Sequence, residues 1–292
     1  MTSLHADHYA DNLVQLRSPL VTNRCVARDT FLCRIDAPEI AGAVIPGQFV
    51  MIRMAQHDAP LIGRAFAVWD IINDDSGSPR FIELIYLRKG TLTRALASAP
   101  VGTPMDVWGP LGNGFAARPC DRLIMTAGGI GQTPMLLLGK EAIGTTDFGR
   151  EHGWANHVEI IYGARTAELL AGVEAFRTAG FEVTVCTDDG STGQTGRVPD
   201  VLATRLTELK DTGTTRVVTC GPEIMMQRVS KVCDQHGVDC QVSMETPMAC
   251  GIGICFSCVA KIRQDDPNQP WDYKRTCVEG PIFDSSRVHW DD

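Results

Sequence analysis

The feature that most constrains this chain is a cluster of cysteines near its C-terminal end. The 292-residue sequence contains 11 cysteines. Seven of them are spread along the chain: Cys25, Cys33, Cys120, Cys186, Cys220, Cys233 and Cys240. The other four fall within 28 residues: Cys250, Cys255, Cys258 and Cys277. Because the N-terminus does not resemble a secretory signal, such clustering indicates a metal site rather than disulfides.

The spacing of these four cysteines favours one kind of metal centre. The run METPMACGIGICFSC, followed later by YKRTC, has the pattern C-x4-C-x2-C and then a lone cysteine after eighteen residues. This spacing is typical of a [2Fe–2S] cluster held in a tight loop. Gly251 and Gly253 suit such a loop, because they let the backbone approach the cluster closely. A structural zinc site is the alternative, although zinc favours two C-x2-C pairs and only one is present.

Composition and charge exclude several classes of function. Hydrophobic residues make up 44% of the chain and charged residues 21%, which is enough for a buried core. The net charge of −8 gives no electrostatic basis for binding nucleic acid. The sequence has no apolar run of 18 residues or more, so we expect no membrane span. We therefore expect a cytoplasmic protein.

The chain from about residue 22 to 115 consists of short β-type segments separated by Gly, Pro and Asp turns. These segments are RCVARDTFLCRIDA, GQFVMIRMA, RAFAVWDII, RFIELIYLR and MDVWGPL. Their spacing predicts a closed antiparallel barrel, with one short helix at TLTRALASA.

From Arg122 onward the pattern changes to strands that alternate with helices of about ten residues. This alternation predicts a doubly wound parallel sheet. The last piece is rich in cysteine and too small to carry its own core. We therefore divide the chain into an N-terminal extension (1–20), a barrel (21–118), a parallel α/β domain (119–243) and a cysteine-rich module (244–292).

Two features of the α/β domain point to a dinucleotide. Gly128, Gly129 and Gly131 follow the first parallel strand and open a helix, where a pyrophosphate could approach the backbone. They do not spell G-x-G-x-x-G, and a plain packing turn is the alternative. Asp188 and Asp189 follow a later strand, where carboxylates can bind a ribose diol and repel a 2′-phosphate. They favour NAD over NADP, with a solvated acidic turn as the alternative.

The barrel offers two candidate segments for a phosphate-containing cofactor. Arg64, Ala65, Phe66 and Ala67 follow a short connection, and the segment IYLRKGT follows a later strand. An arginine near a barrel mouth can pair with a phosphate through two hydrogen bonds. A surface arginine is the alternative.

Taken together, these motifs identify a family. From about Thr22 onward the chain resembles the ferredoxin-reductase superfamily, and its last fifty residues resemble the electron-transfer subunits of class 1B dihydroorotate dehydrogenases. The segments that carry the resemblance are Met248–Gly253 with the two following cysteines, Cys277–Pro281, Gly112–Phe115, Tyr162–Arg165 and Cys220–Glu223.

The resemblance implies a six-stranded FAD-binding barrel, an NAD-binding domain and a C-terminal [2Fe–2S] module. It places the FAD motif Arg-x-Tyr/Phe-Ser/Thr on Arg64, Phe66 and Ala67, where alanine replaces a hydroxyl that usually bonds the flavin. Cys220 and Gly221 are placed beside the nicotinamide. A second FAD segment, about two residues shorter than usual here, falls on Ile85, Tyr86, Leu87, Arg88, Gly90 and Thr91.

These cofactors imply a division of chemistry. A nicotinamide transfers two electrons as a hydride, a [2Fe–2S] cluster takes one, and FAD can convert between them. In the family the partner is an FMN-containing catalytic subunit that oxidises dihydroorotate, in a complex of two subunits of each kind. This chain has no second barrel for that reaction.

Two other interpretations remain open. The chain could be a flavin and iron–sulfur subunit of another complex, such as a hydrogenase or a ferredoxin–NAD(P) oxidoreductase. It could instead be a non-catalytic redox sensor or a zinc-stabilised binding module, which would be colourless when purified anaerobically. An oxygenase reductase is disfavoured, because a full ferredoxin domain is larger than the cysteine-rich module.

Overall fold

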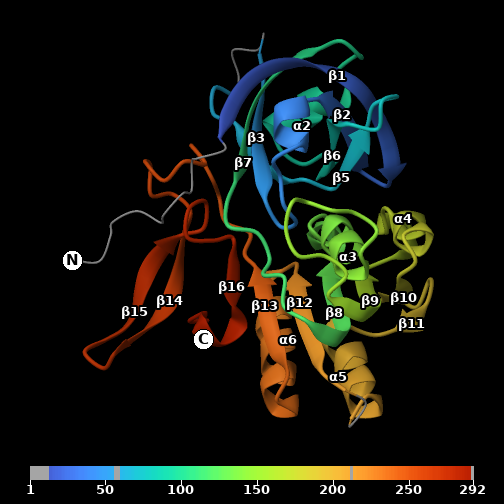
Figure 1. Ribbon diagram of the computed structural model, residues 1–292, viewed down its shortest axis with the longest axis vertical. Helices are drawn as coiled ribbons and strands as arrows, with labels where there is room; N and C mark the ends of the chain where they lie inside the picture. The colour runs from blue at the N-terminus through green and yellow to red at the C-terminus, as the bar shows by residue number, and fades with distance from the viewer. Residues whose placement is uncertain (1–12, 56–59, 211–212, 291–292) are drawn as a thin grey trace.

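The computed structural model describes residues 13–55, 60–210 and 213–290. These residues form a curled antiparallel sheet, a parallel sheet flanked by helices, and a projecting hairpin (Figure 1). The curled sheet lies at the top of Figure 1, the parallel sheet below it and the hairpin to one side. None of the described helices has both the length and the apolar character needed to cross a membrane.

The curled sheet contains seven of the described strands, in the order β4-β3-β7-β1-β2-β6-β5, and all of its pairings are antiparallel. The strands are β1 (Val14–Ala27), β2 (Thr30–Asp36), β3 (Phe49–Met54), β4 (Arg64–Ala67), β5 (Asp70–Asn73), β6 (Pro79–Leu87) and β7 (Pro104–Leu111). Two short helices, α1 (Pro38–Ala41) and α2 (Thr91–Ala97), accompany them. The predicted helix at TLTRALASA is therefore confirmed as α2.

The barrel differs from its prediction in closure, in strand count and in where it begins: among the described strands, the edge strands β4 and β5 do not pair with each other, so the sheet is curled rather than closed. The segment RAFAVWDII, expected as one strand, forms β4 and β5, which lie at opposite edges of the sheet with Val68 and Trp69 between them in the chain. This split gives seven strands instead of six. Strand β1 begins at Val14 and pairs with β7, so the barrel takes in residues that were expected in the N-terminal extension. The rest of that extension, residues 1–12, lies outside the described residues.

The second sheet has the order β11-β10-β9-β8-β12-β13-β16. Its strands are β8 (Cys120–Gly128), β9 (Ala155–Ala164), β10 (Glu182–Thr187), β11 (Gln194–Thr195), β12 (Thr215–Cys220), β13 (Asp239–Ser243) and β16 (Ile282–Asp284). All are parallel except β16, which is antiparallel to β13. The helices are α3 (Met135–Ile143), α4 (Val173–Thr178), α5 (Val198–Glu208) and α6 (Glu223–His236).

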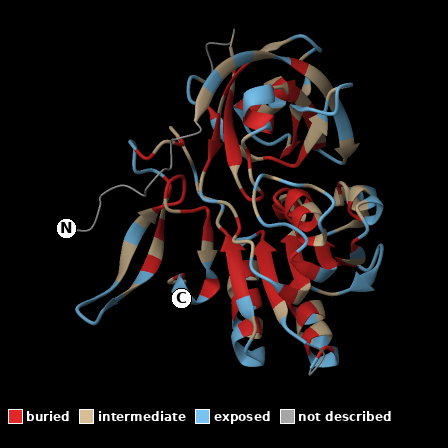
Figure 2. Cartoon of the chain, viewed as in Figure 1, coloured by how far each residue is buried: buried red, intermediate tan, exposed pale blue. Residues whose placement is uncertain are grey.

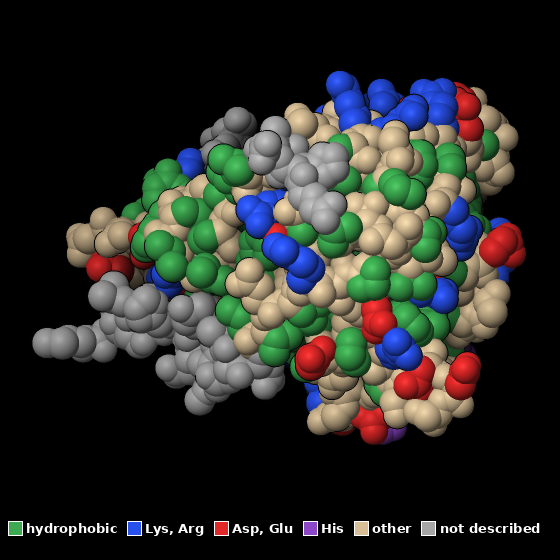
Figure 3. All heavy atoms as spheres, turned by 90° about the horizontal axis from the view of Figure 1, so that it is seen from above, with side chains coloured by type: hydrophobic (Ala, Val, Ile, Leu, Met, Phe, Trp, Pro, Cys, Tyr) green, Lys and Arg blue, Asp and Glu red, His purple; other side chains and the backbone are tan. Residues whose placement is uncertain are grey.

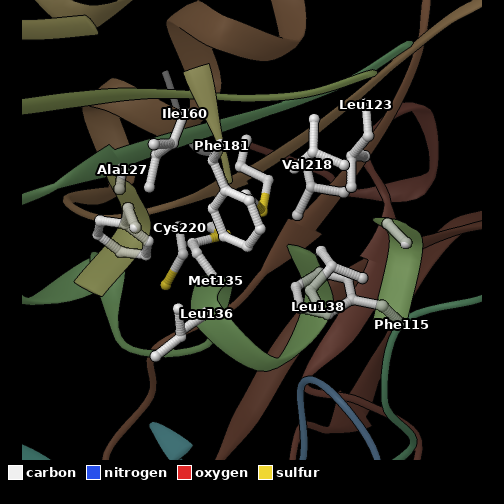
Figure 4. Packing of buried hydrophobic residues seen from close by; sticks show 14 of the residues in the cluster. Phe115, Leu123, Ala127, Met135, Leu136, Leu138, Ile160, Phe181, Val218 and Cys220 are labelled. Atoms are coloured by element: carbon white, nitrogen blue, oxygen red, sulfur yellow. The ribbon is translucent and has the colours of Figure 1, made fainter. Parts of the chain in front are cut away.

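The helices cover both faces of this sheet, as a doubly wound fold requires. Leu123 and Met125 of β8 pack with α3 on one face, part of which Figure 4 shows. Ile124, between them in the same strand, packs with α5 and α6 on the other face. This alternation follows from the two-residue period of a strand. The predicted parallel α/β domain is confirmed.

Two helical segments of this domain begin with a separate 3₁₀ turn. The turn after β8 is a 3₁₀ helix (Gly129–Gln132), and α3 begins only at Met135. The segment AELLAGVEAFRTAG forms a 3₁₀ turn (Ala167–Leu169) and then the short α4. Gly172 separates the two with a φ of 78°, a left-handed conformation that ends regular helix.

The cysteine-rich module depends on both larger domains for its core. Its hairpin consists of β14 (Val259–Asp266) and β15 (Gln269–Arg275), and a final 3₁₀ turn covers Ser285–Arg287. The thiols of Cys258 and Cys277 pack with Met51 and Leu111 of the barrel. Strand β16 joins the parallel sheet. Figure 2 shows the resulting burial where the module meets the other domains, whereas the hairpin is mostly exposed or intermediate.

The barrel and the α/β domain are joined by a mixed polar and aromatic contact. The ammonium of Lys140 in α3 donates to both carboxylate oxygens of Asp70 in β5, at 2.6 and 2.7 Å. Next to this ion pair, Trp69 packs edge-on against Phe176 of α4, with ring centroids 5.2 Å apart. These contacts fix the junction where two cofactors would have to meet.

Candidate functional site

The four clustered cysteines come together as two pairs. The sulfur atoms of Cys250 and Cys255 are 3.3 Å apart, and those of Cys258 and Cys277 are 3.2 Å apart. Two thiolates on one tetrahedral metal at about 2.3 Å would have sulfurs about 3.8 Å apart, so each pair is close to the geometry of one metal ion. In the described part of the chain no three metal-ligating side chains surround a single point. Paired thiols match a two-iron cluster, in which each iron takes two of the four cysteines.

The loop that carries these thiols needs glycine at two positions. Gly251 and Gly253 have φ angles of 76° and 79°, in the left-handed region. A Cβ on Gly251 would lie 2.6 Å from Cγ of Met51, and one on Gly253 would lie 2.7 Å from Cγ2 of Val278. The backbone N–H of Ile252 points at the Cys250 sulfur, at 3.4 Å. The loop therefore has the tight, amide-lined shape that suits an iron–sulfur cluster.

Hydrogen bonds favour the thiolate form that a metal requires. Burial by itself raises the pKa of the Cys255 thiol, but hydrogen bonds from the hydroxyl and backbone N–H of Ser257 lower it to about 7. A hydrogen bond from Cys277 lowers the pKa of Cys258 to about 6. The same hydrogen bond raises the pKa of Cys277, which keeps its proton in this pair. One thiolate in each pair is thus favoured near neutral pH.

The cluster loop is buried on one side and open on the other. Cys258 and Cys277 are each 1% exposed, whereas Cys255 is exposed and lies between Ile254 at 74% and Phe256 at 63% exposure. Figure 3, which views the molecule from above Figure 1, shows hydrophobic side chains on the lobe at the left of the view. The Cys255 side of the loop is therefore accessible to another protein.

A cavity of about 750 Å³ lies at the carboxyl ends of the parallel strands. Gly128, Gly129, Asp188 and Gly221 all contribute to its wall. Gly129 has a φ of 55°, and a Cβ placed on it would meet nothing within 4 Å. An open backbone at this edge of a doubly wound sheet is where such folds bind nucleotides. The cavity fits a dinucleotide.

Three predicted nucleotide residues do not line this cavity. The Asp189 carboxylate turns away and accepts hydrogen bonds from the backbone N–H and hydroxyl of Ser191, at 3.0 and 2.6 Å. A Cβ on Gly131 would collide with the carbonyl of Cys220, so that glycine permits two strand ends to pack closely. Burial raises the pKa of the Cys220 thiol to about 12, and Cys220 belongs to the core cluster that includes α3 rather than to the cavity wall.

The sequence did not indicate four basic residues of the cavity wall as nucleotide ligands: Lys89, Arg165, Arg197 and Arg228. Three of them lie in connections between strands and helices, and Arg228 lies in the second turn of α6. Arg197 precedes α5 directly, and Arg165 follows β9. Their guanidinium and ammonium groups could neutralise a diphosphate. Position at the carboxyl edge of the sheet was the signal that could have identified them.

The predicted flavin motif lies in the edge strand β4. The Arg64 side chain is exposed, and its Nη1 donates to the carbonyls of Ile62 and Gly63, both at 3.0 Å. The Phe66 ring packs edge-on against Tyr86, with centroids 6.1 Å apart. None of the four residues of the motif lines the nucleotide cavity. An exposed arginine at the end of an edge strand leaves room for a phosphate-bearing cofactor.

The second predicted flavin segment begins in the buried end of β6 and continues into the exposed turn before α2. The side chains of Ile85 and Tyr86 are 3% and 1% exposed and belong to the protein core. Leu87 contributes to the nucleotide cavity, and Arg88 forms an ion pair of 2.6 Å with Asp29. The structure therefore removes two of the predicted side chains from the surface. The two side chains point to opposite faces of β6, and both faces are covered: Ile85 packs in the cluster that includes α3, and Tyr86 in the core of the barrel.

Basic residues surround a second cavity of about 620 Å³ beside this segment. Its wall includes Arg28, Arg88, Lys89, Arg94 and Arg165. Gly90 and Thr91 lie at the adjacent start of α2, where the Gly90 N–H donates to the Thr93 hydroxyl at 3.0 Å. The excess of positive charge suits the diphosphate of a dinucleotide such as FAD.

Comparison with known proteins agrees with this geometry. Residues 245–289 match the family described as the iron–sulfur cluster binding domain of dihydroorotate dehydrogenase B, and residues 125–231 match the oxidoreductase NAD-binding domain. A solved structure described as an NADH-dependent reduced ferredoxin-NADP oxidoreductase superimposes with a TM-score of 0.75 at 26% identity, covering 94% of this chain and 90% of that one.

Two curated relatives are named as the electron transfer subunit of dihydroorotate dehydrogenase B (NAD(+)). The protein of Desulforamulus reducens is 32% identical, over 91% of this chain and 95% of the relative. That of Geobacillus kaustophilus is 32% identical, over 93% of this chain and 97% of the relative. The chain therefore belongs to the family of dihydroorotate dehydrogenase B electron transfer subunits.

Proposed function

We propose that this chain transfers electrons between NAD(H) and a catalytic partner subunit that interconverts dihydroorotate and orotate, in pyrimidine biosynthesis. It acts as the NAD-linked oxidoreductase subunit of that complex. The observation that carries the proposal is the surface loop with two cysteine pairs, on the same chain as a dinucleotide cavity. A loop of this kind gives electrons that enter from a nucleotide a route to the protein surface.

Each domain has one role in this proposal. The barrel, residues 21–118 together with the earlier part of β1, holds FAD through Arg64 and the basic cavity beside Arg88. The α/β domain, residues 119–243, holds NAD against Gly128, Gly129 and Asp188. The module, residues 244–292, holds the [2Fe–2S] cluster through four ligands: Cys250, Cys255, Cys258 and Cys277. When bound, FAD accepts an electron pair with a hydride and passes electrons on singly.

The residues at the nicotinamide end of the cavity act by shape rather than by ionisation. The Cys220 thiol keeps its proton, because burial raises its pKa to about 12. Gly221 has a φ of 156°, and a Cβ there would lie 3.0 Å from the backbone nitrogen of Gly128. Gly221 therefore supplies a thin wall against which a nicotinamide ring can lie, with the buried and neutral Cys220 next to it in the chain.

The partner subunit docks on the open side of the cluster loop, in this proposal. Ile254 and Phe256 flank Cys255 and are both largely exposed. Phe256 adopts a left-handed φ of 55°, which is unusual for a bulky residue, and the Arg275 guanidinium lies over its ring at 5.1 Å. Strain that keeps an aromatic ring in solvent is typical of functional sites. The partner carries FMN, and two subunits of each kind assemble.

The experiment that tests this function is reconstitution with the catalytic subunit. The purified chain should reduce an artificial dye with NADH, and dihydroorotate-dependent NAD⁺ reduction should appear only when the catalytic subunit is added. Phe256→Asp should weaken assembly by about tenfold or more, because it places a charge in an apolar interface. Tyr273→Asp, at an exposed residue of the hairpin, is the matched control.

In a different outcome, reconstitution yields no orotate while the chain oxidises NADH with ferredoxin as the electron acceptor. That result would instead assign the chain to a ferredoxin–NAD(P) oxidoreductase. That outcome is the second candidate function, because the solved structure with a TM-score of 0.75 is of this type. A colourless chain with neither activity would contradict both.

Asp188 should make the chain prefer NADH to NADPH. Its carboxylate lines the nucleotide cavity, where a 2′-phosphate would meet a like charge. Such repulsion costs about 1–3 kcal/mol, or about ten- to a hundredfold in affinity. Asp188→Asn should therefore raise kcat/KM for NADPH, while Asp189→Asn should not, because Asp189 faces Ser191 instead. Equal use of both nucleotides by the unmodified chain would contradict this role.

A further inference from the structure

Trp108 in β7 contacts two segments that the proposed function assigns to different cofactors. Its indole Nε1–H donates a hydrogen bond of 3.0 Å to the backbone carbonyl of Cys250, a proposed cluster ligand. At the other end of the ring, a Cβ on Gly63 would collide with Cη2 of Trp108. The indole thus lies directly against the residue that precedes Arg64 in the flavin strand.

The surroundings of the ring place it between the two sites. Trp108 packs in one apolar cluster with Ala65 of β4 and with the thiols of Cys258 and Cys277. The cluster loop also touches β3, the strand between β4 and β7, because a Cβ on Gly251 would lie 2.6 Å from Cγ of Met51. Trp108 itself is partly buried. The indole is therefore a bridge between the strand that carries the flavin motif and the loop that carries the thiols.

We propose that Trp108 is a positioning residue for electron transfer within this chain. It fixes the orientation of the cluster loop on β4. It thereby sets the reduction potential of the cluster and the rate at which the reduced flavin passes electrons to the cluster. The physical reason is that hydrogen bonding and solvent exposure around a cluster determine its potential. The inference rests on the proposed function, since it needs both cofactors in this chain.

The first test is Trp108→Phe, which retains an aromatic ring and removes the N–H donor. The Cys250 carbonyl then loses its hydrogen-bond donor. Because one hydrogen bond makes a modest net contribution to the free energy, its loss changes an equilibrium constant by up to about tenfold. We expect the equilibrium for electron transfer from flavin to cluster to shift by about tenfold, or about 59 mV for a one-electron couple. The rapid reduction of flavin by NADH should stay unchanged. The readouts are stopped-flow absorbance, a redox titration and the electron paramagnetic resonance spectrum of the reduced cluster.

Gly63→Ala perturbs the other end of the same bridge. The added methyl group pushes on the ring and leaves the donor for Cys250 in place. This variant should also change the cluster spectrum and potential, and its effect should not add to that of Trp108→Phe, because both act through one ring. Trp271→Phe is the matched control, since that tryptophan packs on Tyr273 and His289 in the module.

The outcomes separate this inference from the proposed function. If the unmodified protein lacks the cluster, or if NADH does not reduce its flavin, the proposed function is wrong and this inference falls with it. In the other case, the unmodified protein contains both cofactors and NADH reduces its flavin as proposed. If both variants then retain iron and FAD and have the cluster potential and spectrum of the unmodified protein, only the role of Trp108 is overturned. If Trp108→Phe loses iron, the Gly63→Ala variant provides the test instead. An unchanged potential and spectrum of the cluster in that variant would overturn the role of Trp108.

Discussion

Replacement of Cys258 by alanine is expected to separate two activities of this chain. Transfer of electrons from NADH to the catalytic partner should fall to background, because the cluster loses one of its four ligands. Reduction of an artificial dye by NADH should stay within about twofold of the parent, since the hydride step involves only the barrel and the α/β domain. Both activities are measured side by side in one preparation with known FAD and iron content.

The physical basis is that a thiolate ligand has no equivalent among the neighbouring side chains. Cys258 is 1% exposed and lies 3.2 Å from Cys277, so water has little access to replace it. Cys25→Ala is the matched control, because that cysteine is exposed and lies outside the cluster loop. Equal loss of both activities, with FAD occupancy and melting temperature unchanged, would show that the cluster does not follow the flavin in the electron path.

The close approach of the four proposed cluster ligands could be predicted because these cysteines lie close together in sequence. A C-x4-C-x2-C loop can hardly keep its thiols apart, and the lone Cys277 returns beside Cys258 at the end of a simple hairpin. The alternation of strands and helices likewise predicted the parallel sheet. Both predictions rest on local patterns, which a single sequence contains in full.

The rest of the site depends on contacts between distant parts of the chain. Trp108 and Cys250 are 142 residues apart, and no local pattern in either segment indicates their hydrogen bond. Arg165, Arg197 and Arg228 meet at one cavity only because the end of β9 and the N-terminal ends of α5 and α6 come to the same edge of the sheet. The separation of β4 from β5 was missed for the same reason, since both are equally suitable as strand and only the curl of the sheet sends them to opposite edges.

The glycines after β8 show that one motif can serve two purposes. Gly129 opens onto the nucleotide cavity, whereas Gly131 faces the end of β12. The sequence alone presented both as cofactor glycines. Three-dimensional packing assigns Gly131 to the joint between strands, and that assignment has a measurable consequence for stability.

Gly131→Ala should destabilise the protein and weaken NADH binding together. The new methyl group would collide with the carbonyl of Cys220 and lie 2.6 Å from the backbone nitrogen of Gly221. Backbone atoms cannot rotate away as a side chain can, so β12 or the turn must move. We expect a loss of about 2–4 kcal/mol in the free energy of unfolding. Because Gly221 lines the cavity, KM for NADH should rise in the same variant.

Gly237→Ala separates this collision from ordinary glycine strain. Gly237 ends α6 with a left-handed φ of 65°, and a Cβ there would meet nothing within 4 Å. Its replacement should cost about 1–2 kcal/mol through backbone strain and leave KM for NADH unchanged. Urea unfolding and steady-state kinetics with NADH and a dye measure both quantities. If Gly131→Ala has the same midpoint of urea unfolding and the same KM for NADH as the unmodified protein, the close packing of β12 against the glycine turn does not shape the nucleotide site. A matched loss of stability in both variants, with KM raised only by Gly131→Ala, would instead locate the effect at the wall formed by Gly221.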